Sequence, residues 1–164
     1  MEFTKYNHSI QEKKIYDFWE KNNLFKPKSK KLKKTFSIVI PPPNITGRLH
    51  MGHALNSSLQ DVLIRYYRMN GYETLWQPGT DHAGIATQAI VEKNLAKEKI
   101  DKNIIGREKF IEKVWEWKIK SGDLILEQLK KLGCSCDWSR SRFTMDKLMS
   151  EVVTKVFVAL YNKK

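Results

Sequence analysis

The chain has 164 residues, and its 30 lysines and arginines against 18 aspartates and glutamates give a formal net charge of +12. This length suits one domain with a real core, and the positive charge fits a polyanionic partner such as tRNA without identifying one. No apolar run approaches the roughly 20 residues that span a bilayer, and the polar start is unlike a signal peptide, so we expect a cytoplasmic protein.

The N-terminal segment predicts an amphipathic helix from Ser9, a suitable N-cap, to about Phe25. Its apolar stripe consists of Ile10, Ile15, Phe18, Trp19 and the following Leu24. Residues 26–34 contain six lysines and read as a linker. We therefore divide the chain into a helix with its linker, residues 1–34, and a second part, residues 35–164.

A strand, a turn and a helix follow the linker. Residues 35–40 form an apolar run that is rich in β-branched side chains and ends at prolines, which predicts a buried strand. The next helix has His50 and His53 in its first turn, and its apolar residues recur at helical spacing: Leu55, Leu59, Val62, Leu63 and Tyr66. Because the first amides of a helix lack internal partners, we expect this turn to bind an anion, a phosphate above all.

Three alternatives to a phosphate-binding site are possible at this turn. A P-loop fits the spacing of Gly47 and Gly52, but His53 and Ala54 stand where it needs a lysine and a serine or threonine. Simple surface histidines at a helix start are the second alternative.

A metal site is the third alternative. It would combine His50 and His53 with Asp81 and His82. The histidine pair is spaced i, i+3, however, and neither a glutamate between the two nor a nearby cysteine completes a familiar zinc site.

A second strand is predicted at residues 72–76, after a helix stop at Asn70 and Gly71. Strand, helix and strand in this order indicate a right-handed parallel βαβ unit of a doubly wound α/β fold, whose ligands bind at the carboxyl ends of the strands. Pro78 and Gly79 break the chain there, so we expect Asp81 and His82 at the same edge as Asn44 and His50.

The rest of the chain predicts three more helices. They span residues 85–99, residues 107–132 with a stop at Gly133, and residues 147–161, with a loop or short strand at 137–144. The middle helix should bury Phe110, Ile111, Val114, Trp115 and Trp117. Cys134 and Cys136 lie too close in sequence for a Cys-x-x-Cys pair, so we expect reduced thiols.

Two motifs carry a resemblance to a known family. The tetrapeptide from His50 to His53 resembles the His-Ile-Gly-His signature of class I aminoacyl-tRNA synthetases, and the run 41–54 resembles its version in valyl-tRNA synthetases. Residues 79–88 resemble a second motif of the valyl enzymes, whereas isoleucyl and leucyl relatives carry a Trp-Asp pair where Thr80 and Asp81 stand. The resemblance extends from the N-terminal helix to Arg140.

The resemblance implies the first half of a Rossmann-like catalytic domain that ends near the start of the family's editing insertion. The Lys-Met-Ser-Lys-Ser signature is absent, so we expect the N-terminal portion of an enzyme that is not active alone. The implied reaction is activation of valine by ATP with Mg²⁺ and transfer of valine to tRNA(Val). Valine, ATP and tRNA(Val) are the expected partners, with neither a membrane nor DNA.

The resemblance also implies roles for individual residues. His50 and His53 would stabilise charge on the phosphates, and Asp81 would accept the ammonium group of the amino acid, unless it merely caps the following helix. The implied ATP site comprises Pro43, Asn44, Thr46, Gly47, His50, Met51, Gly52 and His53. The implied amino-acid site comprises Pro41, Pro42, Asn44 and Asp81, and no protein-bound metal is expected.

Two alternatives to this function remain. A nucleotidyltransferase of the same superfold would share the histidine-bearing helix but would lack the block around Asp81. A non-catalytic tRNA-binding fragment would bind nucleic acid without any response to an amino acid.

Overall fold

The computed structural model describes residues 6–28 and 34–163, which form two compact units. Of the described residues, the first unit contains 6–28 and 34–40 together with 50–78 and 127–140. The second unit contains residues 41–49, 79–126 and 141–163. Each unit is therefore assembled from segments that are distant in the sequence.

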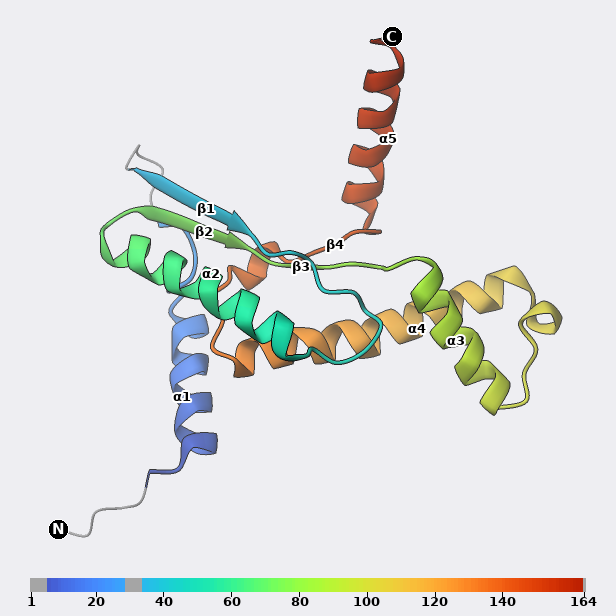
Figure 1. Ribbon diagram of the computed structural model, residues 1–164, viewed down its shortest axis with the longest axis horizontal. Coiled ribbons are helices and arrows are strands. Elements are labelled where there is room, and N and C mark those ends of the chain that lie inside the picture. The colour runs from blue at the N-terminus through green and yellow to red at the C-terminus, as the bar shows by residue number, and fades with distance from the viewer. Residues whose placement is uncertain (1–5, 29–33, 164) are drawn as a thin grey trace. The chain divides into compact units, whose positions relative to one another are not determined.

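A parallel βαβ motif is the centre of the first unit (Figure 1). It consists of β1 (Thr35–Val39), α2 (Met51–Met69) and β2 (Glu73–Gln77), and the strands pair from Thr35↔Glu73 to Val39↔Gln77. Strand β1 stops one residue before the predicted Ile40, whose N–H still donates to the Gln77 carbonyl at 3.0 Å. The predicted α/β fold with parallel strands is confirmed.

Helix α2 buries a different face from the one that its apolar residues suggest. Ser57 and Ile64 are buried, whereas the stripe that predicted the helix is exposed: Leu55, Leu59, Val62, Leu63 and Tyr66. On the packed side, Arg68 donates to Thr74 Oγ1 at 3.2 Å and to Ser135 Oγ at 3.1 Å. Polar side chains thus fasten α2 to β2 and to the loop after α4, and the helix ends at Asn70 and Gly71 as predicted.

The N-terminal helix α1 (His8–Lys21) differs from its prediction in its cap, in its buried residue and in its end, which lies at Lys21 and not near Phe25. Asn7 is the N-cap instead of Ser9, since its side chain accepts from the Ile10 N–H at 3.4 Å. Of the predicted stripe, Ile10, Ile15 and Phe18 are exposed, and Tyr16 is buried in their place. The Tyr16 hydroxyl decides this, because it donates to the Cys134 carbonyl at 2.6 Å and accepts from Trp138 Nε1 at 2.7 Å.

The second unit contains a two-residue parallel ladder between β3 (Gly79–Thr80) and β4 (Arg142–Phe143). Its helices are α3 (Ile85–Lys97), α4 (Lys102–Lys131), whose last five residues, 127–131, belong to the first unit, and α5 (Lys147–Tyr161). Gly106 has a non-helical φ of 79°, so the regular part of α4 begins where the sequence predicts, and Gly133 at φ 86° terminates it. A 3₁₀ turn, η1 (Trp138–Arg140), follows in the first unit.

Helix α4 is less buried than predicted, and α5 is almost wholly exposed. Phe110, Val114 and Trp117 are half-buried, but Ile111 and Trp115 are exposed, so the predicted core of α4 is only partly correct. Helix α5 has the predicted bounds and is exposed at every residue except Met149, which is half-buried. In the ranges that the structure describes, no helix is long and apolar enough to cross a bilayer.

Candidate functional site

His50 and His53 form a reciprocal cap at the start of α2. His50 is the N-cap residue, and its Nδ1 accepts from the Gly52 N–H at 3.1 Å. His53, three residues later, accepts the main-chain N–H of His50 on its own Nδ1 at 3.2 Å. The two rings lie 4.0 Å apart between centroids. The same histidines therefore satisfy amides of the helix start, as serine and glutamate do in an ordinary capping box.

These hydrogen bonds determine which ring nitrogen carries the proton. A main-chain N–H can only donate, so Nδ1 of each histidine must be an unprotonated acceptor. Each neutral ring then carries its proton on Nε2. Burial, and secondly the neighbouring His50, lower the pKa of His53, which favours this neutral form. The helix start thus presents two Nε2–H donors without needing a charged imidazolium.

Gly52 leaves room for the ring of His50. A Cβ at position 52 would lie 3.0 Å from His50 Cε1 and 3.1 Å from His50 Nδ1. The resemblance placed Gly52 in the ATP site, and the structure shows that a side chain at this position would meet the ring of His50.

The prolines and Asn44 precede this cap and belong to the second unit. The Pro43 carbonyl accepts from the Asp81 N–H at 2.8 Å, and the Ile45 N–H donates to the Asp81 carbonyl at 3.0 Å, so Asn44 and Asp81 form a parallel β-bridge. Pro41 and Pro42 are exposed next to it. This bridge brings together the two segments from which an amino-acid site was predicted.

The loop that follows Asn44 is anchored by a buried residue. Ile45 is 1% exposed, and its carbonyl accepts from Trp117 Nε1 at 2.7 Å and from Ser121 Oγ at 3.0 Å. Thr46 and Gly47 are half-buried beyond this anchor. Helix α4 therefore fixes the main chain from which Asn44 projects.

Asp81 and His82 lie directly after β3, and Thr144 lies directly after β4. The Thr144 hydroxyl is 2.8 Å from Asp81 Oδ1 and 2.6 Å from His82 Nδ1. Asp81 does not cap α3, because Gly84 is the N-cap and makes no side-chain bond. The capping alternative for Asp81 is therefore wrong. Thr144 was not predicted, because only the β3–β4 pairing reveals its place beside Asp81.

The predicted residues thus fall into two groups. Asn44 and Asp81 meet in the second unit, while His50, Met51, Gly52 and His53 open α2 in the first unit, where Met51 and Gly52 are exposed. The expectation that both groups share one edge stays a prediction. Within the described residues, no group of three or more histidines, cysteines, aspartates and glutamates is arranged to hold a metal ion.

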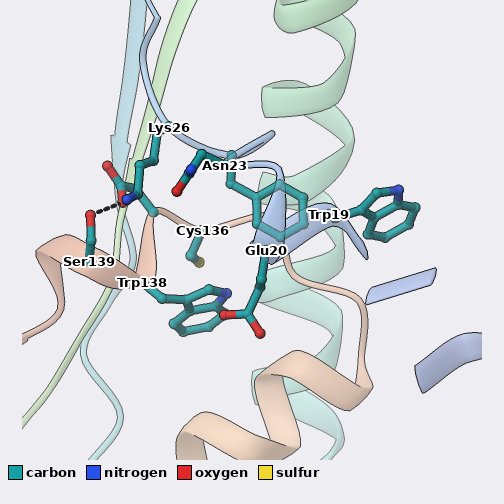
Figure 2. Close-up of a pocket in the computed structure, with 9 residues that line it drawn as sticks. Trp19, Glu20, Asn23, Lys26, Cys136, Trp138 and Ser139 are labelled. Atoms are coloured by element: carbon teal, nitrogen blue, oxygen red, sulfur yellow. Dashed lines mark hydrogen bonds between the residues drawn. The ribbon is translucent and has the colours of Figure 1, made fainter. Parts of the chain in front are cut away.

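Figure 2 shows a separate pocket in the first unit, between the end of α1 and residues 136–139. It is lined by Trp19, Glu20, Asn23, Phe25, Lys26, Cys136, Asp137, Trp138 and Ser139. Asp137 accepts from the Ser139 hydroxyl at 2.6 Å, and Arg140 pairs with it at 3.2 Å. Its volume of about 170 Å³ is below that of ordinary ligand pockets, and none of the predicted site residues line it.

The fold matches that of a class I synthetase. The LeuRS in a ternary complex with tRNA and LeuAMS from Agrobacterium radiobacter K84 superposes with a TM-score of 0.76 at 22% identity, over 97% of this chain and 18% of that one. The family model described as tRNA synthetases class I (I, L, M and V) matches residues 14–164. This chain belongs to that family.

The curated relatives include valine–tRNA ligases from several bacteria. The protein from Pelagibacter ubique (strain HTCC1062) is 72% identical over 159 residues, which are 97% of this chain and 18% of the relative. The protein from Geobacter sulfurreducens is 57% identical over 158 residues, 96% of this chain and 18% of its own length. The chain thus spans about 18% of the length of these relatives.

Proposed function

We propose that these residues form the ATP- and valine-binding part of a valine–tRNA ligase. The reaction joins the carboxylate of valine to the α-phosphorus of ATP, releases pyrophosphate with its Mg²⁺, and then passes valine to tRNA(Val). The observation that supports this proposal most is the reciprocal histidine cap, because it leaves two neutral histidines with protonated Nε2 at a helix start that favours an anion.

The histidines would act on the phosphates. Negative charge on the phosphoryl oxygens grows as the carboxylate attacks, and preorganised donors stabilise it at little reorganisation cost. With Nδ1 held by the main chain, Nε2–H of His50 and His53 can take this role at any pH at which the rings are neutral. Met51, Gly52, Thr46 and Gly47 would line the nucleotide.

The second unit would bind the amino acid. Asp81 carries the carboxylate that the ammonium group of valine requires, and the bridge to Asn44 sets its main chain beside the prolines. Pro41 and Pro42 would contact the aliphatic side chain, and Pro43 and Asn44 would face ATP. The positive charge of the chain, +12, suits contacts with the phosphates of tRNA. A cytoplasmic location also remains part of the proposal.

A chimera tests this function directly. This chain replaces the matching N-terminal segment of the Pelagibacter ubique relative, and pyrophosphate exchange is measured with valine, isoleucine and threonine. We expect exchange that depends on valine. Replacing His53 by alanine should slow adenylate formation about 100-fold with little change in valine affinity, because one preorganised donor is lost.

A substitution at the amino-acid site should instead weaken the binding of valine. Asp81→Asn turns a charge-assisted hydrogen bond into a neutral one, so valine binding should weaken by about 1 to 3 kcal/mol while ATP affinity is retained. Exchange that is independent of the amino acid would contradict the proposal and favour a nucleotidyltransferase. Binding of tRNA without any exchange would instead favour a nucleic-acid-binding role.

A further inference from the structure

Thr144 stands beside Asp81 because of the short parallel ladder in the second unit. Gly79 pairs with Arg142 and Thr80 pairs with Phe143, so the residues that follow each strand are also adjacent. The Thr144 N–H donates to the Thr80 carbonyl at 3.1 Å and continues the ladder by one bond. A side chain at position 79 is excluded, since its Cβ would lie 2.9 Å from the Arg142 carbonyl oxygen. The main chain therefore holds Thr144 at a fixed distance from Asp81.

The Thr144 hydroxyl has three polar neighbours. They are Asp81 Oδ1 at 2.8 Å, the main-chain nitrogen of His82 at 2.9 Å and His82 Nδ1 at 2.6 Å. A hydroxyl has one proton to donate and two lone pairs to accept with. The main-chain N–H of His82 must donate, and the ionised carboxylate of Asp81 must accept. The single hydroxyl proton consequently points to Asp81.

This assignment fixes the tautomer of His82. Because the proton of Thr144 is used by Asp81, His82 Nδ1 must carry its own proton and donate it to Thr144 Oγ1. Asp81 Oδ1, 3.3 Å from the same nitrogen, reinforces this arrangement. The neutral ring of His82 thus has a free lone pair on Nε2, which is the opposite tautomer from that of His50 and His53.

Two acceptors are left without partners by this arrangement. In residues 6–28 and 34–163, neither Asp81 Oδ2 nor His82 Nε2 has a hydrogen bond. Their side chains are 34% and 40% exposed. The Thr144 hydroxyl thus holds Asp81 through Oδ1 and His82 through Nδ1. Asp81 Oδ2 and His82 Nε2 remain as acceptors for a ligand that donates hydrogen bonds.

We propose that Thr144 is a positioning residue of the amino-acid site, which holds Asp81 and His82 so that their free acceptors receive the ammonium group of an α-amino acid. This inference rests on the proposed function of Asp81, and it adds two residues to the site. Thr144 does not touch the substrate. It keeps Asp81 in one rotamer and His82 in one tautomer before the amino acid arrives.

The tautomer can be measured without any activity. In the chain labelled with ¹⁵N-histidine, long-range proton–nitrogen spectra should show His82 protonated on Nδ1 and His50 and His53 protonated on Nε2. Thr144→Val keeps the shape but removes the hydroxyl, and should shift His82 toward a mixture of tautomers. Thr144→Ser keeps the hydroxyl and should retain the Nδ1–H form. Circular dichroism checks that each variant is folded.

The functional arm uses the chimera described above. Thr144→Val should raise the KM for valine about tenfold, as expected when a bond to a charged group is lost, and leave kcat and the KM for ATP nearly unchanged. Thr144→Ser should restore the KM for valine. His82→Gln, which retains an acceptor, should be closer to the wild type than His82→Leu.

The results separate the positioning role of Thr144 from the proposed role of Asp81 in binding the ammonium group. A wild-type His82 protonated on Nε2, or a tautomer that Thr144→Val leaves unchanged, would overturn the positioning role whatever the enzyme does. If the valine KM were the same in Thr144→Val and Thr144→Ser, the role would be overturned as well. If Asp81→Asn left the valine KM intact, the proposed function of Asp81 would fail, although the spectra would still report how Thr144 holds it.

Discussion

At the start of α2, the ring of His50 occupies the space that a side chain at position 52 would need. We predict that Gly52→Ala displaces this ring and breaks its bond from the Gly52 N–H. His50 should then lose its preference for the Nε2–H tautomer, as seen by ¹⁵N spectra of the chain. Gly47→Ala is the matched control, because a Cβ there has no atom within 4 Å. Equal spectra for the two variants would contradict the prediction.

The lowered pKa of His53 predicts a loss of stability in acid. Its ordinary value is 6.5, so as the pH falls below this value the unfolded chain takes up the proton before the folded chain does. The stability that neutral His53 contributes is fully present above pH 6.5. It is lost as the pH falls from 6.5 through the lower pKa of the folded chain. Protonation of Nδ1 also removes the acceptor for the His50 N–H.

The test of this pH dependence compares urea midpoints at about pH 7.5 and about pH 5, on either side of the ordinary histidine pKa. His53→Gln keeps an acceptor but does not titrate, so its midpoint should fall less than that of the wild type. A midpoint that falls equally in both proteins would assign the acid sensitivity to other groups.

At the scale of elements, α1 is held to the first unit through one hydroxyl. Tyr16→Phe removes the hydroxyl that donates to the Cys134 carbonyl and accepts from Trp138 Nε1. Both groups then lose this hydrogen-bond partner. We expect the free energy of unfolding to fall by about 1 to 3 kcal/mol, the usual effect of unsatisfied buried polar groups. Tyr66→Phe on the exposed face of α2 is the control and should change it little. Urea denaturation measures both, and similar losses would show that Tyr16 is not the anchor.

Local signals in the sequence predicted the elements well, and long-range contacts account for what was missed. The end of α2 at Asn70 and Gly71 and the end of α4 at Gly133 were predicted correctly. A glycine in the left-handed conformation after a helix is a signal that depends only on the local sequence. The burial of Tyr16 depends on Cys134, more than a hundred residues away, so periodicity could not find it. Thr144 was missed for the same reason, since only the pairing of β3 with β4 places it next to Asp81.

At the scale of the whole molecule, each unit exposes an apolar helix face. On α2 it consists of Leu55, Leu59, Val62, Leu63 and Tyr66, and on α5 of Val152, Val153, Val156, Phe157 and Leu160. Monomeric soluble proteins seldom leave such continuous apolar surface uncovered. Apolar periodicity thus predicted both helices correctly, although these faces are exposed.

We therefore predict that the 164-residue chain associates with itself as its concentration rises. Leu59→Lys should weaken this association in sedimentation velocity experiments. Ser58→Lys adds the same charge at an exposed polar position of α2 and should have a smaller effect. A chain that sediments as a monomer at every concentration would contradict the prediction.

Cys134 and Cys136 are free and buried in the first unit, next to the anchors of α1 and α2. Burial raises the pKa of Cys134 to about 12, so at neutral pH the thiol is protonated and a poor nucleophile. Alkylating reagents can then react only when the surrounding loop opens and the thiolate forms in water. The rate of alkylation, compared with that of a free thiol, therefore reports the free energy of this opening. Alkylation of the two native cysteines can therefore measure local unfolding of the first unit without any introduced label.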